Sequence, residues 1–174
     1  DGTVEKIETK NIIIATGSKP IEIPSAPFGK NIVDSTGALG FTKVPETLGV
    51  VGAGIIGLEL GSVWSRLGSK VTVIEALDDF LPMADKDISK ESFKEFKKQG
   101  LDIKLSSTVT KCSEHKEYVS VSYECQGEEI EKKFEKLIVA VGRYPNSSEV
   151  ISDELNISID KGFIKVNEFC QTSV

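Results

Sequence analysis

The sequence has few of the residues that build metal centres and disulfide frameworks. Its 174 residues include one histidine, His115, and three cysteines, Cys112, Cys125 and Cys170. An odd number of widely separated cysteines fits neither a zinc site nor a disulfide network, so we expect reduced thiols. His115 lies in the charged stretch SEHKEY, where we expect a solvated turn. We therefore expect no metal site and no catalytic residue in this chain.

Long hydrophobic runs and an excess of basic charge are also absent. No apolar run approaches the roughly 20 residues of a membrane span. The opening residues, DGTVEKIETK, lack the basic-then-apolar pattern of a signal peptide. The 27 acidic and 21 basic residues give a net charge of -6, which disfavours nucleic acid as a partner. The composition is that of a soluble globular protein, and we expect neither a membrane nor a nucleic-acid partner.

Short apolar segments alternate with helical patterns after Thr47. The expected elements are a buried strand over 48–52, a helix over 55–67, a strand over 71–75, a helix from Asp85 or Asp87 to about Gln99, and a strand over 101–105. In the first helix the apolar residues at helical spacing are Ile56, Leu60, Val63, Trp64 and Leu67.

The pattern then changes to strict alternation. In YVSVSYE the side chains of Val119, Val121 and Tyr123 share one face, as in a half-exposed antiparallel strand. Segments 108–114 and 128–134 complete a three-stranded meander with turns near His115 and Gly127. Buried strands follow over 137–142 and 162–166. This order predicts an α/β fold, a doubly wound parallel Rossmann-like sheet with an antiparallel β-meander as its last crossover.

The first 46 residues do not follow this α/β order. The apolar run Ile12–Ala15 predicts a short buried strand that ends in a turn at Gly17 and Pro20. Residues 19–45 contain four prolines and no long periodic segment. We therefore expect residues 19–46 to form a linker between domains.

The stretch VVGAGIIGLELG holds Gly52, Gly54 and Gly57 in the spacing G-x-G-x-x-G. This triplet is a weak signal alone, but here a buried strand precedes it, an amphipathic helix follows it, and Glu75 ends the next strand. The glycines permit a tight turn, close approach of the backbone to a pyrophosphate, and close packing of helix on strand. The helix N-terminus attracts phosphate, and the Glu75 carboxylate can accept hydrogen bonds from an adenosine ribose.

The residues after Glu75 indicate which dinucleotide binds. The stretch ALDDFLP adds two acids and no base, whereas a 2′-phosphate would be repelled by carboxylates and would need arginines. We therefore expect NAD rather than NADP.

Two further stretches, ATGSKP (15–20) and AVGRYPN (140–146), each place a glycine turn after an apolar strand. With DSTGAL (34–39), residues 44–76, ADKDI (84–88) and GFIKVNEFCQTSV, they make the chain resemble the two-dinucleotide pyridine nucleotide–disulfide oxidoreductases. Within that family, the resemblance is strongest to the dihydrolipoyl dehydrogenases, the E3 components of 2-oxo acid dehydrogenase complexes.

The resemblance implies roles for matching residues. Gly52 to Glu59 would lie beneath NAD, with Ile55 and Ile56 between nicotinamide and flavin and Glu59 near the nicotinamide amide. Val109 would contact the adenine end, and Gly142 would approach the nicotinamide. Thr16, Gly17 and Ser18 would touch FAD from the flavin-domain side. The implied cofactor-binding residues are Thr16, Gly17, Ser18, Gly52, Ala53, Gly54, Ile55, Ile56, Gly57, Leu58, Glu59, Glu75, Val109 and Gly142. Without the family, Glu59 reads as a solvated helix residue, and Val109 and the isoleucines as core.

The resemblance also implies a division of the chain. Residues 1–18 would be a remnant of the FAD-binding domain, 19–46 the linker, 47–145 the NAD(H)-binding core, and 146–174 a final strand and return segment. The family's redox cysteine pair, its base histidine and a first glycine fingerprint for FAD are not in this sequence. We therefore expect a fragment that binds NAD(H) without turnover.

The parent enzyme is implied to be a homodimer that oxidises dihydrolipoamide on a lipoyl domain, in the cytoplasm of a bacterium or the mitochondrial matrix of a eukaryote. Two alternatives remain open at this point. The first is a sister NAD(P)H-dependent reductase of the glutathione or mercuric reductase type. The second is a stand-alone NAD-binding module.

Overall fold

The computed structural model describes residues 2–148 and 150–174, which divide into two compact units. The larger unit is Pro20–Arg143, and the smaller unit combines the residues up to Lys19 with Tyr144–Val174. Most of the expected linker, residues 20–46, therefore belongs to the larger unit. None of the helices among the described residues is long and apolar enough to cross a bilayer.

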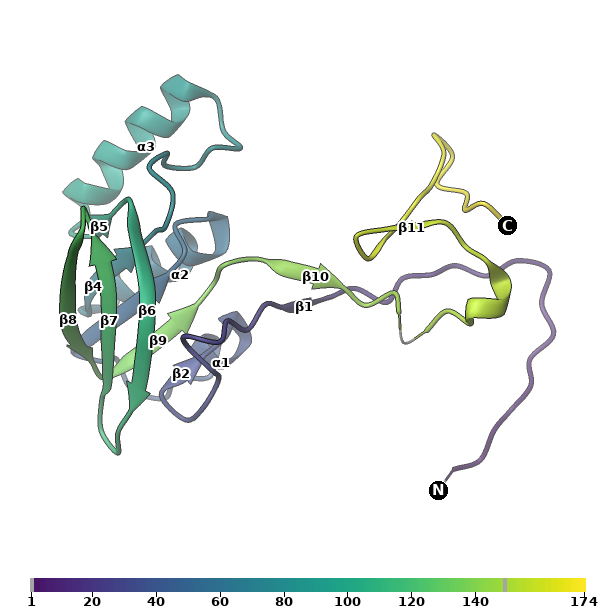
Figure 1. Ribbon diagram of the computed structural model, residues 1–174, viewed down its shortest axis with the longest axis horizontal. Helices are drawn as coiled ribbons and strands as arrows, with labels where there is room; N and C mark the ends of the chain where they lie inside the picture. Colours follow the sequence, from purple (N-terminus) through teal and green to yellow (C-terminus); the bar gives the residue numbers. More distant parts are fainter. Residues whose placement is uncertain (1, 149) are drawn as a thin grey trace. The chain divides into compact units, whose positions relative to one another are not determined.

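A five-stranded parallel sheet forms the centre of the larger unit (Figure 1). Its strands lie in the order β2-β9-β3-β4-β5, so the chain builds outward from β3 through β4 and β5 and then returns to the other side of β3. The strands are β2 (Ile32–Val33), β3 (Thr47–Val51), β4 (Lys70–Ile74), β5 (Asp102–Lys104) and β9 (Lys136–Val139). This confirms the predicted doubly wound α/β fold, with β2 as an edge strand that the sequence did not indicate.

Helices cover one face of this sheet. They are α1 (Ser35–Leu39), α2 (Ile55–Leu67) and α3 (Lys86–Lys98), and the Asp85 side chain caps α3 as expected. Val50 and Val73 point into the core beneath the helices together with Leu60 and Trp64 of α2. Close packing of aliphatic and aromatic side chains in this layer removes apolar surface from water and holds α2 against β3 and β4.

The apolar face of α2 differs in part from the prediction. Leu60 and Trp64 are buried as expected, but Val63 and Leu67 are largely exposed, and the small residues Gly57 and Gly61 are buried instead. Glycines at these positions let the helix backbone lie close to the sheet, which turns the buried face away from Val63 and Leu67.

An antiparallel meander covers the other face. It consists of β6 (Ser107–Glu114), β7 (Val119–Cys125) and β8 (Glu128–Phe134), which pair in that order. Val119, Val121 and Tyr123 all face inward, as the alternation predicts, and they pack on Val51 and Ile74 of the sheet. The turn between β6 and β7 contains exposed His115, whose ring stacks on Tyr118 at 4.4 Å. The predicted meander crossover and its solvated turn are confirmed.

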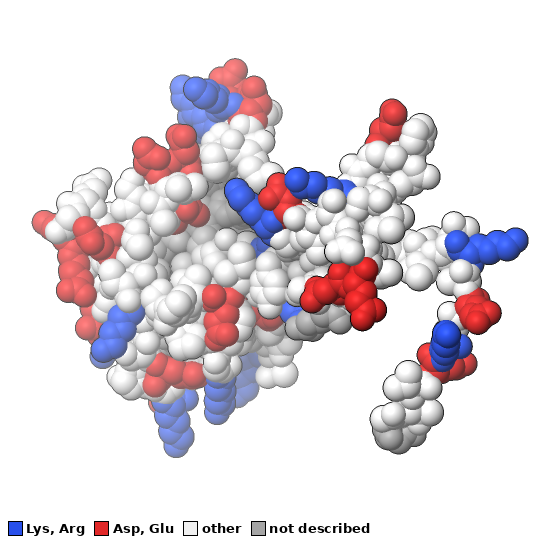
Figure 2. All heavy atoms as spheres, turned by 45° about the vertical axis from the view of Figure 1, so that its right-hand side comes forward, with Lys and Arg blue, Asp and Glu red and all other residues white. Residues whose placement is uncertain are grey.

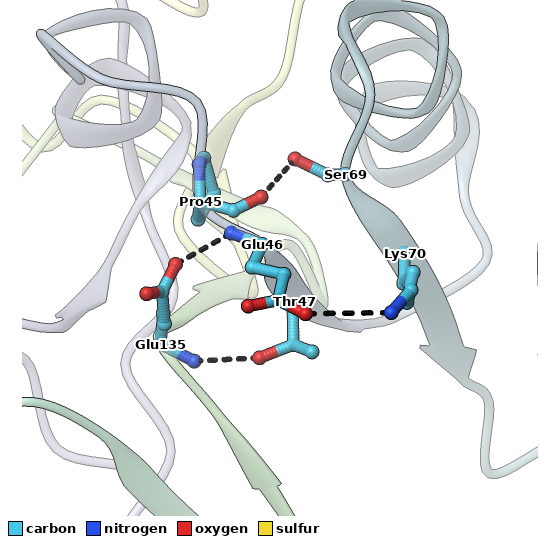
Figure 3. A network of polar contacts seen from close by, with 6 residues as sticks. All are labelled: Pro45, Glu46, Thr47, Ser69, Lys70 and Glu135. Atoms are coloured by element: carbon cyan, nitrogen blue, oxygen red, sulfur yellow. Dashed lines mark hydrogen bonds and ion pairs between the residues drawn. The ribbon is translucent and has the colours of Figure 1, made fainter.

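Polar contacts tie the amino ends of the central strands together (Figure 3). The backbone N–H of Lys70 donates to the Glu46 carbonyl at 2.8 Å, and the Ser69 hydroxyl donates to the Pro45 carbonyl at 2.6 Å. The Lys70 ammonium lies 3.3 Å from the Glu46 carboxylate, and Glu135 accepts from the Glu46 N–H. Backbone groups at this end of the sheet are thus satisfied by the chain itself.

The smaller unit has little regular structure. It contains the 3-10 turn Asp153–Leu155 and a hairpin of β11 (Ile159–Asp160) and β12 (Phe163–Ile164). Strands β1 (Ser18–Pro20) and β10 (Arg143–Pro145) pair with each other where the two units divide. The predicted strand over Ile12–Ala15 is wrong, because these residues form no strand and Ile12 and Ile13 are exposed. The last predicted strand exists only as the short β12, outside the parallel sheet.

Charges of both signs lie on the surface. Figure 2 shows acidic and basic side chains on the same face of the molecule, with uncharged residues between them. The three cysteines are free thiols, as expected.

Candidate nucleotide-binding cleft

The chain reverses its direction across the sheet between β3 and β9, and a cleft of about 1070 Å³ opens at the carboxyl ends of the strands. Open α/β sheets bind ligands at such a switch point, because the loops that leave neighbouring strands diverge there. All residues that line the cleft belong to the larger unit. The cleft is lined by Pro20, Ile23, Ser25, Ser35, Val51, Gly52, Ala53, Gly54, Ile55, Ile56, Ile74, Glu75, Ala76, Leu77, Asp79, Leu81, Pro82, Met83, Ser107, Thr108, Val109, Val139, Ala140, Val141, Gly142 and Arg143.

The glycine loop forms the floor of this cleft. Gly52 has φ +102°, and a Cβ there would lie 2.6 Å from the Ala140 carbonyl at the end of β9. A Cβ on Gly57 would lie 2.1 Å from the Gly52 carbonyl, so the turn and the helix can approach only because both residues lack side chains. Loop and helix therefore need glycine at both positions.

Gly54 faces open space. A Cβ added to it would meet no atom within 4 Å, and Gly54 lines the cleft. The Leu58 N–H is the first to bond within the helix, to the Gly54 carbonyl at 3.0 Å. The N–H groups of Ile55, Ile56 and Gly57 precede it and form the positive end of the helix dipole. This arrangement fits a phosphate group over Gly54.

Glu75 lies at the edge of the cleft, directly after β4. One carboxylate oxygen accepts from the Ala53 N–H at 2.7 Å, and the other accepts from the Leu77 N–H at 2.9 Å. These two bonds fix the carboxylate between the glycine loop and the segment that leaves β4. Each oxygen keeps acceptor capacity for a further donor, so the group is oriented to receive a diol.

The charge around the cleft is uneven. Among the described residues that line it, Glu75 and Asp79 are acidic and lie on the β4 side, and Arg143 is the only base and follows β9. An anionic ligand group is therefore disfavoured beside Glu75 and favoured near Arg143 and the helix N-terminus.

The structure brings most of the expected site residues together. Gly52, Ala53, Gly54, Ile55 and Ile56 line the cleft with Glu75, Val109 and Gly142. Gly57 and Leu58 lie under the loop, with Leu58 in the core, and Glu59 is exposed on α2 outside the lining.

Thr16, Gly17 and Ser18 lie in the smaller unit, apart from the lining residues. There the Thr16 hydroxyl donates to the Asn146 carbonyl at 2.6 Å, and the Asn146 N–H donates to the Gly17 carbonyl at 3.0 Å. This turn is thus fixed by Asn146 of the second glycine motif.

Other lining residues had no motif to reveal them. Pro20, Ile23, Ser25 and Ser35 come from the segment expected to be a linker. Leu77, Leu81, Pro82 and Met83 come from the connection between β4 and α3, where sequence reasoning considered only the charge.

The whole chain, residues 1–174, matches the family described as pyridine nucleotide-disulphide oxidoreductase, and the chain belongs to this family. Its relatives include enzymes named dihydrolipoyl dehydrogenase. The one from Cupriavidus necator is 45% identical over 173 residues, covering 98% of this chain and 36% of that protein. The one from Geobacillus stearothermophilus is 39% identical over 166 residues, covering 95% of this chain and 35% of that protein. The chain thus spans about a third of these relatives.

Solved structures give the same family. The HOCl-induced flavoprotein disulfide reductase RclA from Escherichia coli superposes with a TM-score of 0.79 at 30% identity, covering 91% of this chain and 36% of that chain. LpdA from Mycobacterium tuberculosis superposes with a TM-score of 0.73 at 25% identity, covering 84% and 32%. The family uses FAD and a pyridine nucleotide, and this chain is part of a flavoprotein disulfide oxidoreductase.

Proposed function

We propose that this chain is the NAD(H)-binding part of a dihydrolipoyl dehydrogenase, which oxidises dihydrolipoamide to lipoamide and reduces NAD to NADH. The observation that carries the proposal is the Glu75 carboxylate, held by the Ala53 and Leu77 N–H groups at the edge of the switch-point cleft. A carboxylate in this place selects an unphosphorylated adenosine ribose.

The residues of the cleft would hold the dinucleotide along its length. The N–H groups at the start of α2 bind the pyrophosphate over Gly54, and Glu75 accepts the ribose hydroxyls. Ile55, Ile56, Val141 and Gly142 bound the opposite end of the cleft, where apolar walls exclude water from the nicotinamide. Glu59 would reach the nicotinamide amide from the outer side of α2. When bound, the nicotinamide supplies hydride-accepting chemistry, while the protein fixes its distance and orientation.

The other parts of the proposal follow from the relatives' names and the family. The parent would receive electrons from a lipoyl domain of a 2-oxo acid dehydrogenase complex and pass them through FAD, which Thr16, Gly17 and Ser18 would touch. We propose that the parent is a homodimer and lies in the cytoplasm of a bacterium or the matrix of a mitochondrion. This chain alone binds NAD(H) and does not turn over. A mixture of the chain, dihydrolipoamide, NAD and FAD should therefore form no NADH above background, measured at 340 nm (about this wavelength the reduced nicotinamide absorbs).

Titration with NADH and NADPH, followed by nicotinamide fluorescence, tests the proposed role of Glu75. A 2′-phosphate beside the Glu75 carboxylate costs at least about 1.4 kcal/mol at a surface-like dielectric, so NADH should bind tenfold or more tightly than NADPH. Glu75→Gln removes this charge, and its preference should fall to roughly threefold or less. Glu124→Gln, on the exposed side of the meander, is the matched control and should keep the preference. Equal affinity of the unmodified chain for both dinucleotides would refute the proposal.

A further inference from the structure

The connection between β4 and α3 forms one wall of the cleft. We call residues 77–83 the rim segment. Four of its side chains, Leu77, Leu81, Pro82 and Met83, line the cleft and are apolar, although Met83 is 93% exposed and Leu77 53% exposed. A single exposed apolar residue is ordinary, but several that line one end of a cleft are typical of a ligand surface.

The rim segment is anchored to α3 by Phe80. This ring is buried and meets the rings of Phe93 and Phe96 edge to face, with centroids 5.1 and 6.3 Å away. The Ser89 hydroxyl donates to the Phe80 carbonyl. Aromatic pairs in this geometry add to the free energy of burial, so Phe80 holds the segment in one position against the helix.

Backbone bonds fix both ends of the segment. The Leu77 N–H donates to Glu75, and the Leu77 carbonyl accepts from the Ser106 N–H at 2.9 Å. At the other end the Ala84 N–H donates to the Leu81 carbonyl at 2.9 Å, and Leu81 has a left-handed φ of +48°. The exposed apolar side chains are therefore carried by a fixed backbone rather than by a free loop, and they are available to a ligand without a large ordering cost.

We propose that the rim segment is the adenine-binding wall of the cleft, with Leu77 and Met83 contacting the base and Phe80 positioning them. This inference rests on the proposed function. If Glu75 accepts the adenosine ribose, the base attached to that ribose lies beyond Glu75, on the side away from the glycine loop. At that end the rim segment forms one wall, and Thr108 and Val109 belong to the β6 segment that also lines the cleft. The faces of a purine are apolar, so such walls match it.

The experiment separates the two halves of the dinucleotide. NADH, ADP-ribose and reduced nicotinamide mononucleotide are titrated against the chain and its variants, by fluorescence or by NMR shifts for the weakest ligand. Met83→Ser and Leu77→Ser should each weaken NADH and ADP-ribose roughly fourfold or more, because each buried CH₂ group is worth about that factor in affinity. Both variants should leave binding of the mononucleotide unchanged, since it has no adenine.

The controls separate contact from folding. Leu67→Ser changes a side chain of similar exposure, 55%, that lies outside the cleft, and it should leave all three affinities unchanged. Met83→Leu keeps an apolar contact and should stay within about twofold of the unmodified chain. Phe80→Leu keeps an apolar side chain in the core but loses the ring contacts, and it should weaken ADP-ribose while sparing the mononucleotide.

The outcomes distinguish this inference from the proposed function. Unchanged ADP-ribose affinity in both serine variants, with normal NADH binding by the unmodified chain, overturns the adenine wall alone. Equal weakening of the mononucleotide by these variants also overturns it, because the effect would then be general. If the unmodified chain does not bind NADH, the proposed function and this inference both fail.

Discussion

At the scale of single residues, the three glycines of the motif have different tasks. Gly52 adopts a backbone angle that side chains rarely tolerate, and Gly57 allows contact with the Gly52 carbonyl. Gly54 is not required by packing at all, since a Cβ there meets nothing. The motif thus combines residues needed for the fold with one whose missing side chain leaves room for a ligand.

This difference predicts opposite effects of two alanine substitutions. Gly57→Ala overpacks the turn and should lower the free energy of unfolding by about 1–3 kcal/mol. Gly54→Ala should leave stability within about 0.5 kcal/mol of the unmodified chain but weaken NADH tenfold or more, because the methyl group occupies the place of the phosphate. Urea unfolding and fluorescence titration measure the two effects.

Gly61→Ala is the control on the same helix. A Cβ there finds its nearest neighbour at 3.5 Å, an ordinary contact, so both stability and binding should be preserved. Tight NADH binding by Gly54→Ala would contradict the assignment of the phosphate to this position.

The residues of the motif could be predicted from the sequence because each has a local signature. The glycine spacing and an acid after the next strand are local features, and the structure brings Gly52, Gly54 and Glu75 to one cleft. The partners of Glu75 could not be predicted, since its bonds to the Ala53 and Leu77 N–H groups depend on how two loops meet. Phe80 likewise gives no local signal that it is an anchor.

At the scale of elements, a polar contact fastens the meander to the parallel sheet. Lys132 of β8 donates to the buried Thr72 hydroxyl of β4 at 2.8 Å and lies 3.4 Å from the Asp102 carboxylate of β5. Lys104 lies 2.9 Å from the same carboxylate. Burial raises the pKa of the Asp102 carboxyl, but the bonds and attraction of Lys104 and Lys132 outweigh burial and leave this pKa below its ordinary value.

The lowered pKa gives a prediction with a defined sign. A carboxyl with a lower pKa in the folded chain stabilises the fold above its unfolded pKa, and this contribution is lost as the pH falls through the folded pKa. Asp102→Asn should therefore lower the free energy of unfolding by about 0.5–1 kcal/mol at neutral pH, a modest value because Asp102 is partly solvated. At acidic pH, where the aspartate is protonated, the two proteins should converge.

Urea unfolding at several pH values measures this difference. Glu95→Gln, which removes an exposed ion pair with Lys98 on α3, is the control and should change stability by less than about 0.5 kcal/mol. A difference for Asp102→Asn that persists at acidic pH would show that lost packing, not charge, causes the effect.

Elements with a strong period could be predicted, and short ones could not. The bounds of α2 agree with the prediction over 55–67, because a strand, a glycine turn and Gly68 mark its ends. The two-residue β2 and the five-residue α1 are too short to give a periodic pattern, and their proline-rich surroundings indicated a linker. At Ile12–Ala15 an apolar, β-branched run predicted burial, but burial depends on a partner surface that a local pattern does not specify.

At the scale of the whole molecule, structure and cleft are unequally distributed between the two units. The larger unit contains the parallel sheet, the meander, the three helices and both core clusters of the described residues. The smaller unit holds short hairpins and turns, and several of its large apolar side chains are exposed, among them Phe163 and Phe169. A domain of the larger unit's size with a continuous core can fold without neighbours.

Because every residue that lines the cleft lies within Pro20–Arg143, this part should fold and bind NADH without the rest of the chain. A shortened chain of residues 20–143 should unfold cooperatively in urea, since two packed layers cover the sheet on both faces. Its affinity for NADH should lie within about threefold of the 174-residue chain, because no lining contact is removed. Leu60→Ala in the shortened chain, a core substitution, should cost about 2–5 kcal/mol and provides the comparison for lost folding. Cooperative unfolding together with loss of NADH binding would show that residues outside 20–143 hold the cleft in its binding form, and would contradict the assignment of the whole site to the larger unit.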